Sequence, residues 1–476
     1  MSLPPLVSSR SSGIPVYLVS AAEWEERLSA LPDFVAAAAR AHSFRPKPGN
    51  HLLALNGKGT VGGVLFGVAA PDDPAYDPFI FGTLPTVLPA GTYKFADPPA
   101  KPDLAALSWL LGSYAFTRYK SKPAVEAVLV TPRGVNSEDM LRMAEAVAFG
   151  RDLVNTPTSD LGPDSLESAA VKFAKSRQAK FKVVTGSRLI DKGFPLIHAV
   201  GRAGDEEPRL ITLTWGDKEH PLVTLVGKGV VFDTGGLDIK TSNSMQLMKK
   251  DMGGAAAALA AADMIMSAEL PVRLKVVIPV VENSVSGNSF RPGDVIKSRK
   301  GLTVEIGNTD AEGRLILADA LAFADEEQPD LLIDFATLTG AARVALGPDL
   351  PPFYTRDAAL ADQIQKIGME IHDPVWRMPL WAPYNSYIDG EIADVNNSSN
   401  APYAGSVTAA LFLQRFVEPS TRWVHFDIFA WTPYSRPGRP KGGEVQAARL
   451  VYTLLKRRYR ARPQTPATEE EPAPTE

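Results

Sequence analysis

The fold and the chemistry of this chain are organised around residues 308–315, which read NTDAEGRL and lie between an apolar run and a helical one. If this segment is extended, alternate side chains point to the same face, so Asp310, Glu312 and Arg314 would share one side. Two carboxylates at such short range raise each other's pKa unless a strong positive charge lies among them. One arginine does not balance two acids, so the segment predicts a further positive partner.

Two upstream segments carry the complementary groups: VGKGVVFDTGGLDIK at 226–240 and MKKDMGG at 248–254. Their Lys228, Asp233 and Asp251 have apolar, glycine-rich neighbours, where an unpaired charge would be costly to bury. Together with residues 308–315 they supply four carboxylates, and Lys228 supplies an amine if it loses its proton. Bridging carboxylates can hold two divalent ions roughly 3.5–4 Å apart. The residues therefore permit a site for two metal ions.

Lys240 follows the turn at Gly235 and Gly236 at a distance that could return its charged group to the same pocket. There it could stabilise an oxyanion that develops during a reaction.

Length and composition narrow the class of protein. A chain of 476 residues exceeds the usual size of one domain, so we expect two. The formal net charge of -4 gives no overall attraction to nucleic acid or to an anionic membrane. The absence of cysteine excludes disulfides, thiolate metal ligands and a cysteine nucleophile. The N-terminus lacks the pattern of a secretory signal, and we expect a cytoplasmic enzyme without a membrane span.

Residues 1–150 are predicted to form a smaller α/β domain without a catalytic cluster. The expected strands are 14–19, 51–55, 60–68 and 125–130, and the expected helices are 21–41, 103–119 and 137–154. Turn-forming residues at 155–163 mark the domain junction. Residues 461–476, which are rich in Pro, Thr and Glu, are predicted to be a disordered tail.

Residues 151–460 are predicted to form the larger α/β domain, with a mostly parallel or mixed sheet covered by helices. The expected strands are 181–184, 209–215, 222–232, 273–281 and 331–336, and the expected helices are 163–177, 245–268 and 315–327. Ligands of such sheets bind at the carboxyl ends of the strands. Lys228 and Asp233 sit at the end of one such strand, so we expect the site there.

Taken one at a time, these features also have ordinary structural explanations. Residues 308–310 could be a capped turn before a helix, Lys228 an ion-paired edge lysine, and 233–236 a plain turn. The histidines lack the spacing of metal ligands. His425, two residues before Asp427, could face the site, but we expect a structural role for it.

In combination the segments resemble the leucine aminopeptidase (cytosol aminopeptidase) family of two-metal exopeptidases. The resemblance covers about 220–345, and DLVNTPTSDLGPDSL at 152–166 is similar to the domain junction of the family. It implies an aminopeptidase that releases N-terminal residues, leucine-like ones preferred within a broad range, by means of a water that bridges two ions of zinc or manganese. It also implies a homohexamer that acts on peptides.

The resemblance assigns roles residue by residue. One metal would be held by Lys228, Asp233, Asp251 and Glu312, and the other by Asp233, Asp310 and Glu312. Lys240 would polarise the scissile carbonyl, and Arg314 would hold a bicarbonate that acts as general base. The residues that would line the side-chain pocket or bind the peptide backbone are Met248, Thr337, Leu338 and Gly340.

The chain departs from the family pattern at three places. Thr241 stands where a proline is common, Lys250 replaces a frequent aromatic residue, and residues 425–431 are bulkier than usual. These departures spare the metal ligands but predict a differently shaped pocket for the first residue of the substrate.

Two alternative functions are open at this level. A two-metal phosphoesterase would use the same carboxylates, although phosphate sites generally recruit several arginines or a glycine-rich nest and the motif has one arginine. A non-enzymatic role in DNA binding or as a scaffold is known for some bacterial relatives of this family. The acidic net charge makes nucleic acid an unfavourable partner.

Overall fold

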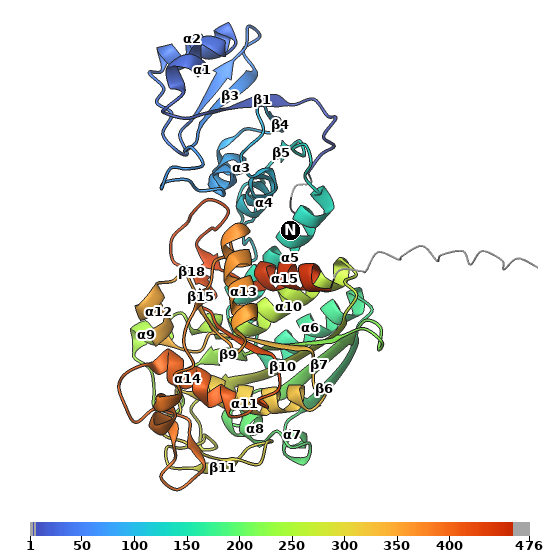
Figure 1. The fold of residues 1–476 in the computed structure, drawn as a ribbon, viewed down its shortest axis with the longest axis vertical. Helices are drawn as coiled ribbons and strands as arrows, with labels where there is room; N and C mark the ends of the chain where they lie inside the picture. Colours follow the sequence, from blue (N-terminus) through green and yellow to red (C-terminus); the bar gives the residue numbers. More distant parts are fainter. Residues whose placement is uncertain (1–2, 4–5, 460–476) are drawn as a thin grey trace, which may run out of the picture.

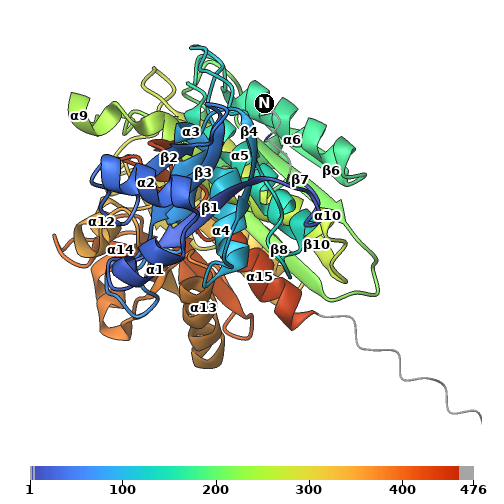
Figure 2. The ribbon, with the colours of Figure 1, turned by 90° about the horizontal axis from the view of Figure 1, so that it is seen from above.

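The structure is a computed structural model that describes residue 3 and residues 6–459. Two sheets dominate it, one of five strands and one of nine. Figure 1 shows the five-stranded sheet, in blue, at one end of the molecule and the nine-stranded sheet at the other. Seen along the long axis in Figure 2, the first sheet lies over the second part rather than beside it. The predicted disordered tail, 461–476, lies outside the described residues.

The N-terminal sheet has the strand order β2-β3-β1-β4-β5, with β2 antiparallel to β3 and the other neighbours parallel. Its strands are β1 (Ile14–Val19), β2 (His51–Leu55), β3 (Val61–Gly67), β4 (Gly91–Phe95) and β5 (Ala127–Leu129). All four strands predicted in this part are present, and β4 is an addition.

The predicted helix over 21–41 is wrong, because the structure has two helices there. They are α1 (Trp24–Ala30) and α2 (Asp33–Ala41), and Leu31 between them is extended. Pro32 explains the break, since a residue that precedes proline is pushed out of the helical region. The remaining helices of this part are η1 (Ile80–Thr83), α3 (Leu84–Val87) and α4 (Pro102–Gly112), the last ending seven residues before the predicted end at 119.

Helix α5 (Ser137–Asn155) joins the two parts. The side chain of Asn136 accepts a hydrogen bond from the Asp139 N–H and caps its first turn. Helix α5 packs against α4 on one side and against α10 (Gly253–Ser267) on the other. The predicted boundary at residue 150 lies within this helix, and the division of the chain at that residue stays a prediction.

The C-terminal sheet has the order β15-β14-β17-β13-β8-β10-β7-β6, with β9 beside β10. Its centre, β17-β13-β8-β10, is parallel, whereas β7, β6 and β14 join antiparallel, so the sheet is mixed. The strands are β6 (Lys180–Thr185), β7 (Arg209–Trp215), β8 (Leu222–Gly227), β9 (Gly229–Asp233), β10 (Arg273–Asn283), β13 (Leu331–Ala336), β14 (Pro352–Tyr354), β15 (Trp376–Arg377) and β17 (Trp423–Asp427).

Helices cover both faces of this sheet, as β10 illustrates. Leu274, Val276 and Ile278 pack into the core on the α10 side, and the alternate residues Val277 and Val281 pack into the core on the α11 side. Behind α10 lie α5 and α15 (Ala448–Arg458), while α8 (Pro195–Gly201) and α14 (Gly405–Gln414) flank α11 (Glu312–Asp325).

The remaining elements are short or peripheral. They are α6 (Pro163–Ser176), α7 (Arg188–Asp191), α12 (Gly340–Leu346), α13 (Ala358–Glu370), η3 (Ala382–Ile388), β11 (Val295–Lys297), β12 (Thr303–Glu305), β16 (Val395–Asn396), β18 (Trp431–Thr432) and β19 (Gly442–Gly443). Among the residues that the structure describes, no helix combines the length and apolarity that crossing a bilayer requires.

Two further predictions fail at the carboxyl edge of the sheet. The apolar run 222–232 is two strands, β8 and β9, which meet at Lys228. Its N–H still donates to Phe335 O of β13 (3.0 Å), but its C=O turns to the start of α10 and accepts from Ala255 N (2.8 Å). The predicted helix over 245–268 is three pieces, α9 (Ser242–Met245), η2 (Met248–Met252) and α10. Both interruptions lie where the polar residues of the motifs occur.

Candidate active site

The motif residues meet in one cleft at the carboxyl ends of β8, β9 and β13. It has a volume of about 130 Å³. All eleven residues to which sequence analysis gave roles line it, and Lys250 and Arg343 line it as well. The eleven are Lys228, Asp233, Lys240, Met248, Asp251, Asp310, Glu312, Arg314, Thr337, Leu338 and Gly340.

Lys228 lies at the bottom of the cleft, between β8 and β9. Its Nζ is 2.8 Å from Asp251 Oδ2 and 2.8 Å from Glu312 Oε1, and it donates to Thr337 O at 3.0 Å. Burial alone would favour the neutral amine, but Asp251 and Glu312 outweigh it and raise the pKa of Lys228 above its ordinary value. Surrounded by carboxylates alone, Lys228 is therefore an ammonium, and a neutral amine requires metal cations beside it.

The segment 308–314 is not the extended strand that the sequence analysis assumed. Residues 308–311 form a turn, in which Asn308 Oδ1 accepts from the Asp310 N–H (2.7 Å), and helix α11 begins at Glu312. Carboxylate oxygens of Asp310 and Glu312 still lie within 4.8 Å of each other and of one from Asp233. The convergence comes from the bend of the chain rather than from the alternation of a strand.

Burial and the crowding of these carboxylates raise the pKa of two of them. Burial raises the pKa of Glu312 to about 8, with a further contribution from the charge of Asp233. Burial and Asp233 likewise raise the pKa of Asp310 to about 6. Lys228 and Lys240 do not neutralise the acids fully, so the donor set fits divalent cations, which carboxylate oxygens bind and which would stabilise the ionised forms.

Lys240 reaches this group from the loop after β9. Its Nζ lies 2.8 Å from Asp233 Oδ2 and also pairs with Asp310. The chain turns back through Gly235, whose φ of +88° disfavours any residue with a side chain. Burial opposes the charge of Lys240, but Asp233 and Glu312 raise its pKa above the ordinary value. Lys240 therefore brings a positive charge to the cleft at neutral pH.

Arg314 lies two residues into α11 and is buried. Its Nη1 donates to Asn397 O at 2.8 Å, and its Nε has no hydrogen-bond partner within the described part of the chain. Burial lowers the pKa of Arg314 to about 10, against the opposing effect of Glu312. The guanidinium remains charged at neutral pH.

Sequence analysis missed the side chains that hold the ligands in place. Asn283 Nδ2 donates to Asp233 Oδ1 (2.8 Å) and to Thr309 O (3.1 Å), and Thr309 Oγ1 donates to Gly235 O (2.6 Å). The signal was an asparagine at the end of the apolar strand β10, two residues beyond the predicted strand end. Asn397, which binds the backbone of residues 307 and 308, carried no such signal.

Residues 337–340 form the wall opposite α11. Thr337 Oγ1 is 2.8 Å from Asp251 Oδ1 and orients that carboxylate. Asp427 Oδ1 accepts from the Leu338 N–H (3.0 Å) and the Thr339 N–H (3.1 Å), which fixes the loop at the end of β17.

His425, the histidine that could have faced the site, lies in the core. Its Nδ1 is 2.6 Å from Asp334 Oδ1, and the other oxygen of Asp334 accepts from Trp423 Nε1 at 2.7 Å. It is fully buried and is not among the residues that line the cleft.

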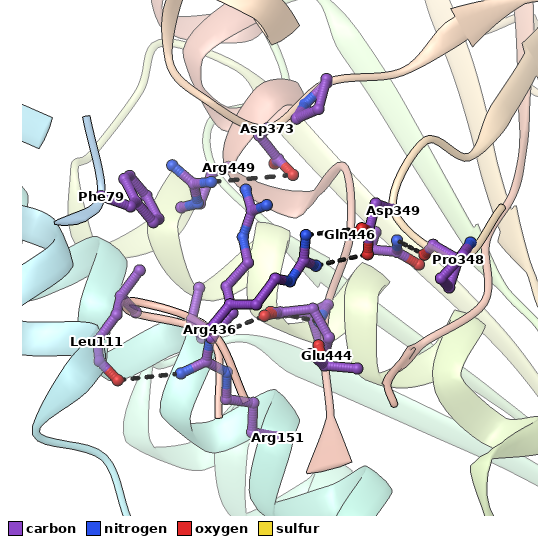
Figure 3. A pocket seen from close by; sticks show the side chains of 15 residues that line it. Phe79, Leu111, Arg151, Pro348, Asp349, Asp373, Arg436, Glu444, Gln446 and Arg449 are labelled. Carbon is purple, nitrogen blue, oxygen red and sulfur yellow. Dashed lines mark hydrogen bonds and ion pairs between the residues drawn. The ribbon is translucent and has the colours of Figure 1, made fainter. Parts of the chain in front are cut away.

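A second cavity, rich in arginine, lies between the two parts of the molecule (Figure 3). Its volume of about 20 Å³ has room for roughly one water. Three of its arginines pair with carboxylates: Arg151 with Glu444 (2.7 Å), Arg436 with Asp349 (2.5 Å) and Arg449 with Asp373 (3.9 Å). The fourth, Arg439, donates to the backbone carbonyl of His372. This cavity lies within the interface between the N-terminal and C-terminal parts. It is too small to hold a substrate.

Comparison with known proteins decides the family. The model of the cytosol aminopeptidase family, catalytic domain, matches residues 148–454, and the model of the M17 aminopeptidase N-terminal domain matches 14–132. The chain belongs to the cytosol aminopeptidase family. A probable cytosol aminopeptidase of Rhodococcus opacus is 41% identical over 372 residues, which cover 74% of this chain and 73% of the relative.

Two solved structures agree with this assignment. The crystal structure of cytosol aminopeptidase from Coxiella burnetii is 45% identical, with a TM-score of 0.90 over 95% of this chain and 98% of that one. The bottromycin maturation enzyme BotP in complex with Mn is 32% identical, with a TM-score of 0.84 over 94% and 100% of the two chains. As a cytosol aminopeptidase, the chain is a metal-dependent peptidase, and the phosphoesterase and DNA-binding alternatives are not favoured.

Proposed function

We propose that this cytosol aminopeptidase removes N-terminal residues from peptides with two divalent ions, zinc or manganese, in the cleft. One ion would be held by Lys228, Asp233, Asp251 and Glu312, and the other by Asp233, Asp310 and Glu312. The observation that carries the proposal is the meeting of Asp233, Asp310 and Glu312, from separate stretches of chain, with oxygens within 4.8 Å of one another. The manganese in BotP supports the choice of ions.

When bound, such a pair of ions lowers the pKa of a water enough for it to act as a nucleophile near neutral pH. The ions would also bind the free α-amine of the substrate. Lys240 would stabilise the negative charge that develops on the scissile carbonyl oxygen. Its raised pKa supports this role, because the ammonium keeps its charge at neutral pH.

Arg314 would hold a bicarbonate that accepts and returns the proton of the water. The nearby carboxylates are all proposed metal ligands, so none is left to move protons. The guanidinium has a free Nε within the described part of the chain and no carboxylate among its hydrogen-bond partners there. A small anion fits that environment.

The wall at 337–340 would bind the substrate. We expect the backbone there, which Asp427 holds through Leu338 and Thr339, to pair with the peptide, and Met248 to contact the side chain of its first residue. A first residue bound through its amine explains why the enzyme would act only at N-termini.

We propose that the enzyme is a cytoplasmic homohexamer. Large apolar side chains are exposed near the cleft and on the segments beside α14, among them Val344 (90%), Ile392 (73%) and Tyr403 (73%). Large exposed apolar side chains gathered in one region are typical of interfaces between subunits, which supports the proposal.

The test is hydrolysis of a panel of aminoacyl anilides by metal-free protein reloaded with zinc, manganese or magnesium. We expect zinc or manganese to restore activity. Lys240→Ala should lower kcat by about 10²–10³ with metal content unchanged, since it removes one stabiliser of the oxyanion. Asp310→Asn should abolish activity and lower the metal content. Exposed Asp362 in α13 provides the control, Asp362→Asn. Full activity after chelation would contradict the proposal.

A further inference from the structure

Two cations in the wall of the cleft have no part in the proposed chemistry. Lys250 lies in η2 directly before Asp251, and its Nζ is 5.4 Å from the centre of the Phe429 ring. Arg343 lies in α12, and its Cζ is 4.6 Å from the centre of the same ring. One aromatic ring therefore collects two positive charges beside the proposed metal site.

Neither cation has a carboxylate of its own within residues 6–459. The acid closest to Lys250 is Asp251, whose Oδ1 is 3.9 Å away, and Asp251 is already bound by Lys228 and Thr337 at 2.8 Å each. Arg343 forms no ion pair among the described side chains. Among the described residues, Lys250 and Arg343 are thus not balanced by an acid of their own.

Contact with Phe429 is a weak explanation for this arrangement. Lys250 is only 2% exposed. Removing a charge from water costs several kcal/mol, whereas a cation over an aromatic ring returns about 0.5–2 kcal/mol. A buried cation without a partner in a cleft is a sign of an anionic ligand.

The position of the two cations identifies which part of a substrate they would meet. Lys250 is two residues from Met248, and Arg343 is three residues, about one helical turn, from Gly340. Met248 is the residue expected to contact the first side chain of the peptide, and Gly340 belongs to the wall expected to bind the peptide backbone beside it. We name the space bounded by Met248, Lys250, Gly340 and Arg343 the first-residue pocket; all four line the cleft.

We propose that the first-residue pocket selects peptides that begin with an acidic residue, aspartate or glutamate. This inference rests on the proposed aminopeptidase function and departs from the leucine-like preference that the family resemblance implies. A carboxylate in the pocket would receive charge-assisted hydrogen bonds from Lys250 and Arg343. A leucine side chain would instead cover both cations and leave them without a partner, which penalises the wrong substrate.

The experiment compares L-glutamyl, L-glutaminyl and L-leucyl anilides on the full chain loaded with manganese. Glutamine is the matched neutral form of glutamate, so the ratio of their kcat/KM values isolates the charge. We expect a ratio of about 10² or more in favour of glutamate, as for sites built to bond a polar substrate group. Lys250→Met and Arg343→Leu should each lower this ratio at least tenfold, and the double variant should prefer leucine. Lys297→Met, on the exposed β11, should leave it unchanged.

A binding measurement makes the inference independent of turnover. Calorimetry with the α-hydroxamates of L-glutamate and L-leucine should give tighter binding of the glutamyl compound by about tenfold, and this difference should vanish in the double variant. Equal affinity, or a preference for leucine that Lys250→Met does not alter, overturns the acidic preference while hydrolysis of leucyl anilide still upholds the aminopeptidase. A protein that takes up no metal and cleaves no anilide overturns both.

Discussion

At the scale of single residues, the position of Lys228 depends on a neighbour without a side chain. A Cβ at Gly313 would lie 2.6 Å from Lys228 Nζ and 2.6 Å from Lys228 Cε, far closer than such atoms approach. The lysine can reach Asp251 and Glu312 only because this residue of α11 is glycine. Neither helix propensity nor a turn requires glycine at position 313. The close approach of the Lys228 side chain does.

We therefore predict that Gly313→Ala displaces Lys228 and weakens metal binding. Metal content after dialysis, measured by mass spectrometry of the elements, should fall by at least one ion per chain, and activity with it. Gly287→Ala is the matched control, because a Cβ there meets nothing within 4 Å. Equal metal content in both variants would show that Lys228 is not a ligand.

The hydroxyl of Thr337 gives a second test at this scale. It donates to Asp251 Oδ1 at 2.8 Å, and groups that orient a metal ligand typically contribute 10–100-fold to metal affinity. Thr337→Val should weaken manganese binding by about that factor in a competition titration, whereas Thr337→Ser keeps the hydroxyl and should bind as the wild type does. A valine variant with unchanged affinity would contradict this role for the hydroxyl.

Residue types and spacing carried most of the information about the site. Four acids, one arginine and two lysines in glycine-rich segments predicted one pocket, and the structure brings them into one cleft. The local geometry could not be predicted, because the assumed strand at 308–314 is a turn and the start of a helix. Asn283 was missed since a single asparagine after a strand is common and nothing local shows that it binds Asp233.

At the scale of elements, the two failures of prediction beside the site share a physical cause. Strands and helices were predicted from apolar periodicity, which is continuous through 222–232 and 245–268. The strand pattern breaks at the buried Lys228, whose C=O accepts from Ala255 N of α10, and the helix pattern contains the 3-10 turn η2 with the buried Asp251. Apolar periodicity records neither change. Elements far from the site, such as β1 and β7, have their predicted bounds, and so does β13, which ends at the cleft without an interruption.

Asp319 in α11 offers a prediction about how two elements are joined. Its Oδ2 accepts from the Leu196 N–H (2.8 Å) at the start of α8, and its Oδ1 accepts from the Arg299 N–H (2.8 Å). Asp319→Ala leaves buried N–H groups without acceptors and should lower the free energy of unfolding by about 1–3 kcal/mol for each. Urea unfolding measures this, with Asp362→Ala on the exposed side of α13 as the control. A loss below about 0.5 kcal/mol, typical of surface changes, would contradict the role of Asp319.

The same carboxyl predicts a dependence on pH. Burial raises the pKa of Asp319 from 3.8 to about 7, despite the backbone N–H groups that favour its charged form. The folded protein holds the proton of Asp319 more tightly than the unfolded chain does. Protonated Asp319 therefore adds to the free energy of unfolding at low pH, and this contribution is lost as pH rises through about 7. The loss of stability caused by Asp319→Ala should therefore be larger at pH near 5 than near 8. A difference that grows with pH would show that the folded form binds the carboxylate instead.

At the scale of the whole molecule, the two parts are joined through Arg151 of α5. Its guanidinium donates to Glu444 Oε2 (2.7 Å) and Gly438 O (2.9 Å) of the C-terminal part and to Leu111 O (3.3 Å) of the N-terminal part. Figure 3 shows the guanidinium of Arg151 between Leu111 and Glu444. The arginine is 1% exposed, so the pair with Glu444 is largely withdrawn from water.

Arg151→Ala would leave the Glu444 carboxylate buried without its partner, which typically costs 3–5 kcal/mol. We expect a loss of that size in chemical denaturation and earlier proteolysis between the two parts. Arg133→Ala, at an exposed arginine, should change stability by less than about 0.5 kcal/mol. Equal stability of the two variants would show that the interface does not depend on this arginine.

Chain length and the order of the elements set the limits of prediction at this scale. Length predicted two parts, and the alternation of strand and helix patterns predicted a mixed α/β architecture, because such elements have few stable arrangements. They could not give the way α5 spans the expected boundary at residue 150, since a continuous helix has no turn signals within it. The assembly of subunits likewise depends on surfaces that no local pattern of residues defines.

The central claim is that the cleft holds two divalent ions, and anomalous diffraction from crystals of the manganese-loaded protein tests it most directly. We predict two peaks, roughly 3.5–4 Å apart, one contacted by Lys228, Asp251 and Glu312 and the other by Asp310. A single peak, or peaks elsewhere in the molecule, would contradict the account.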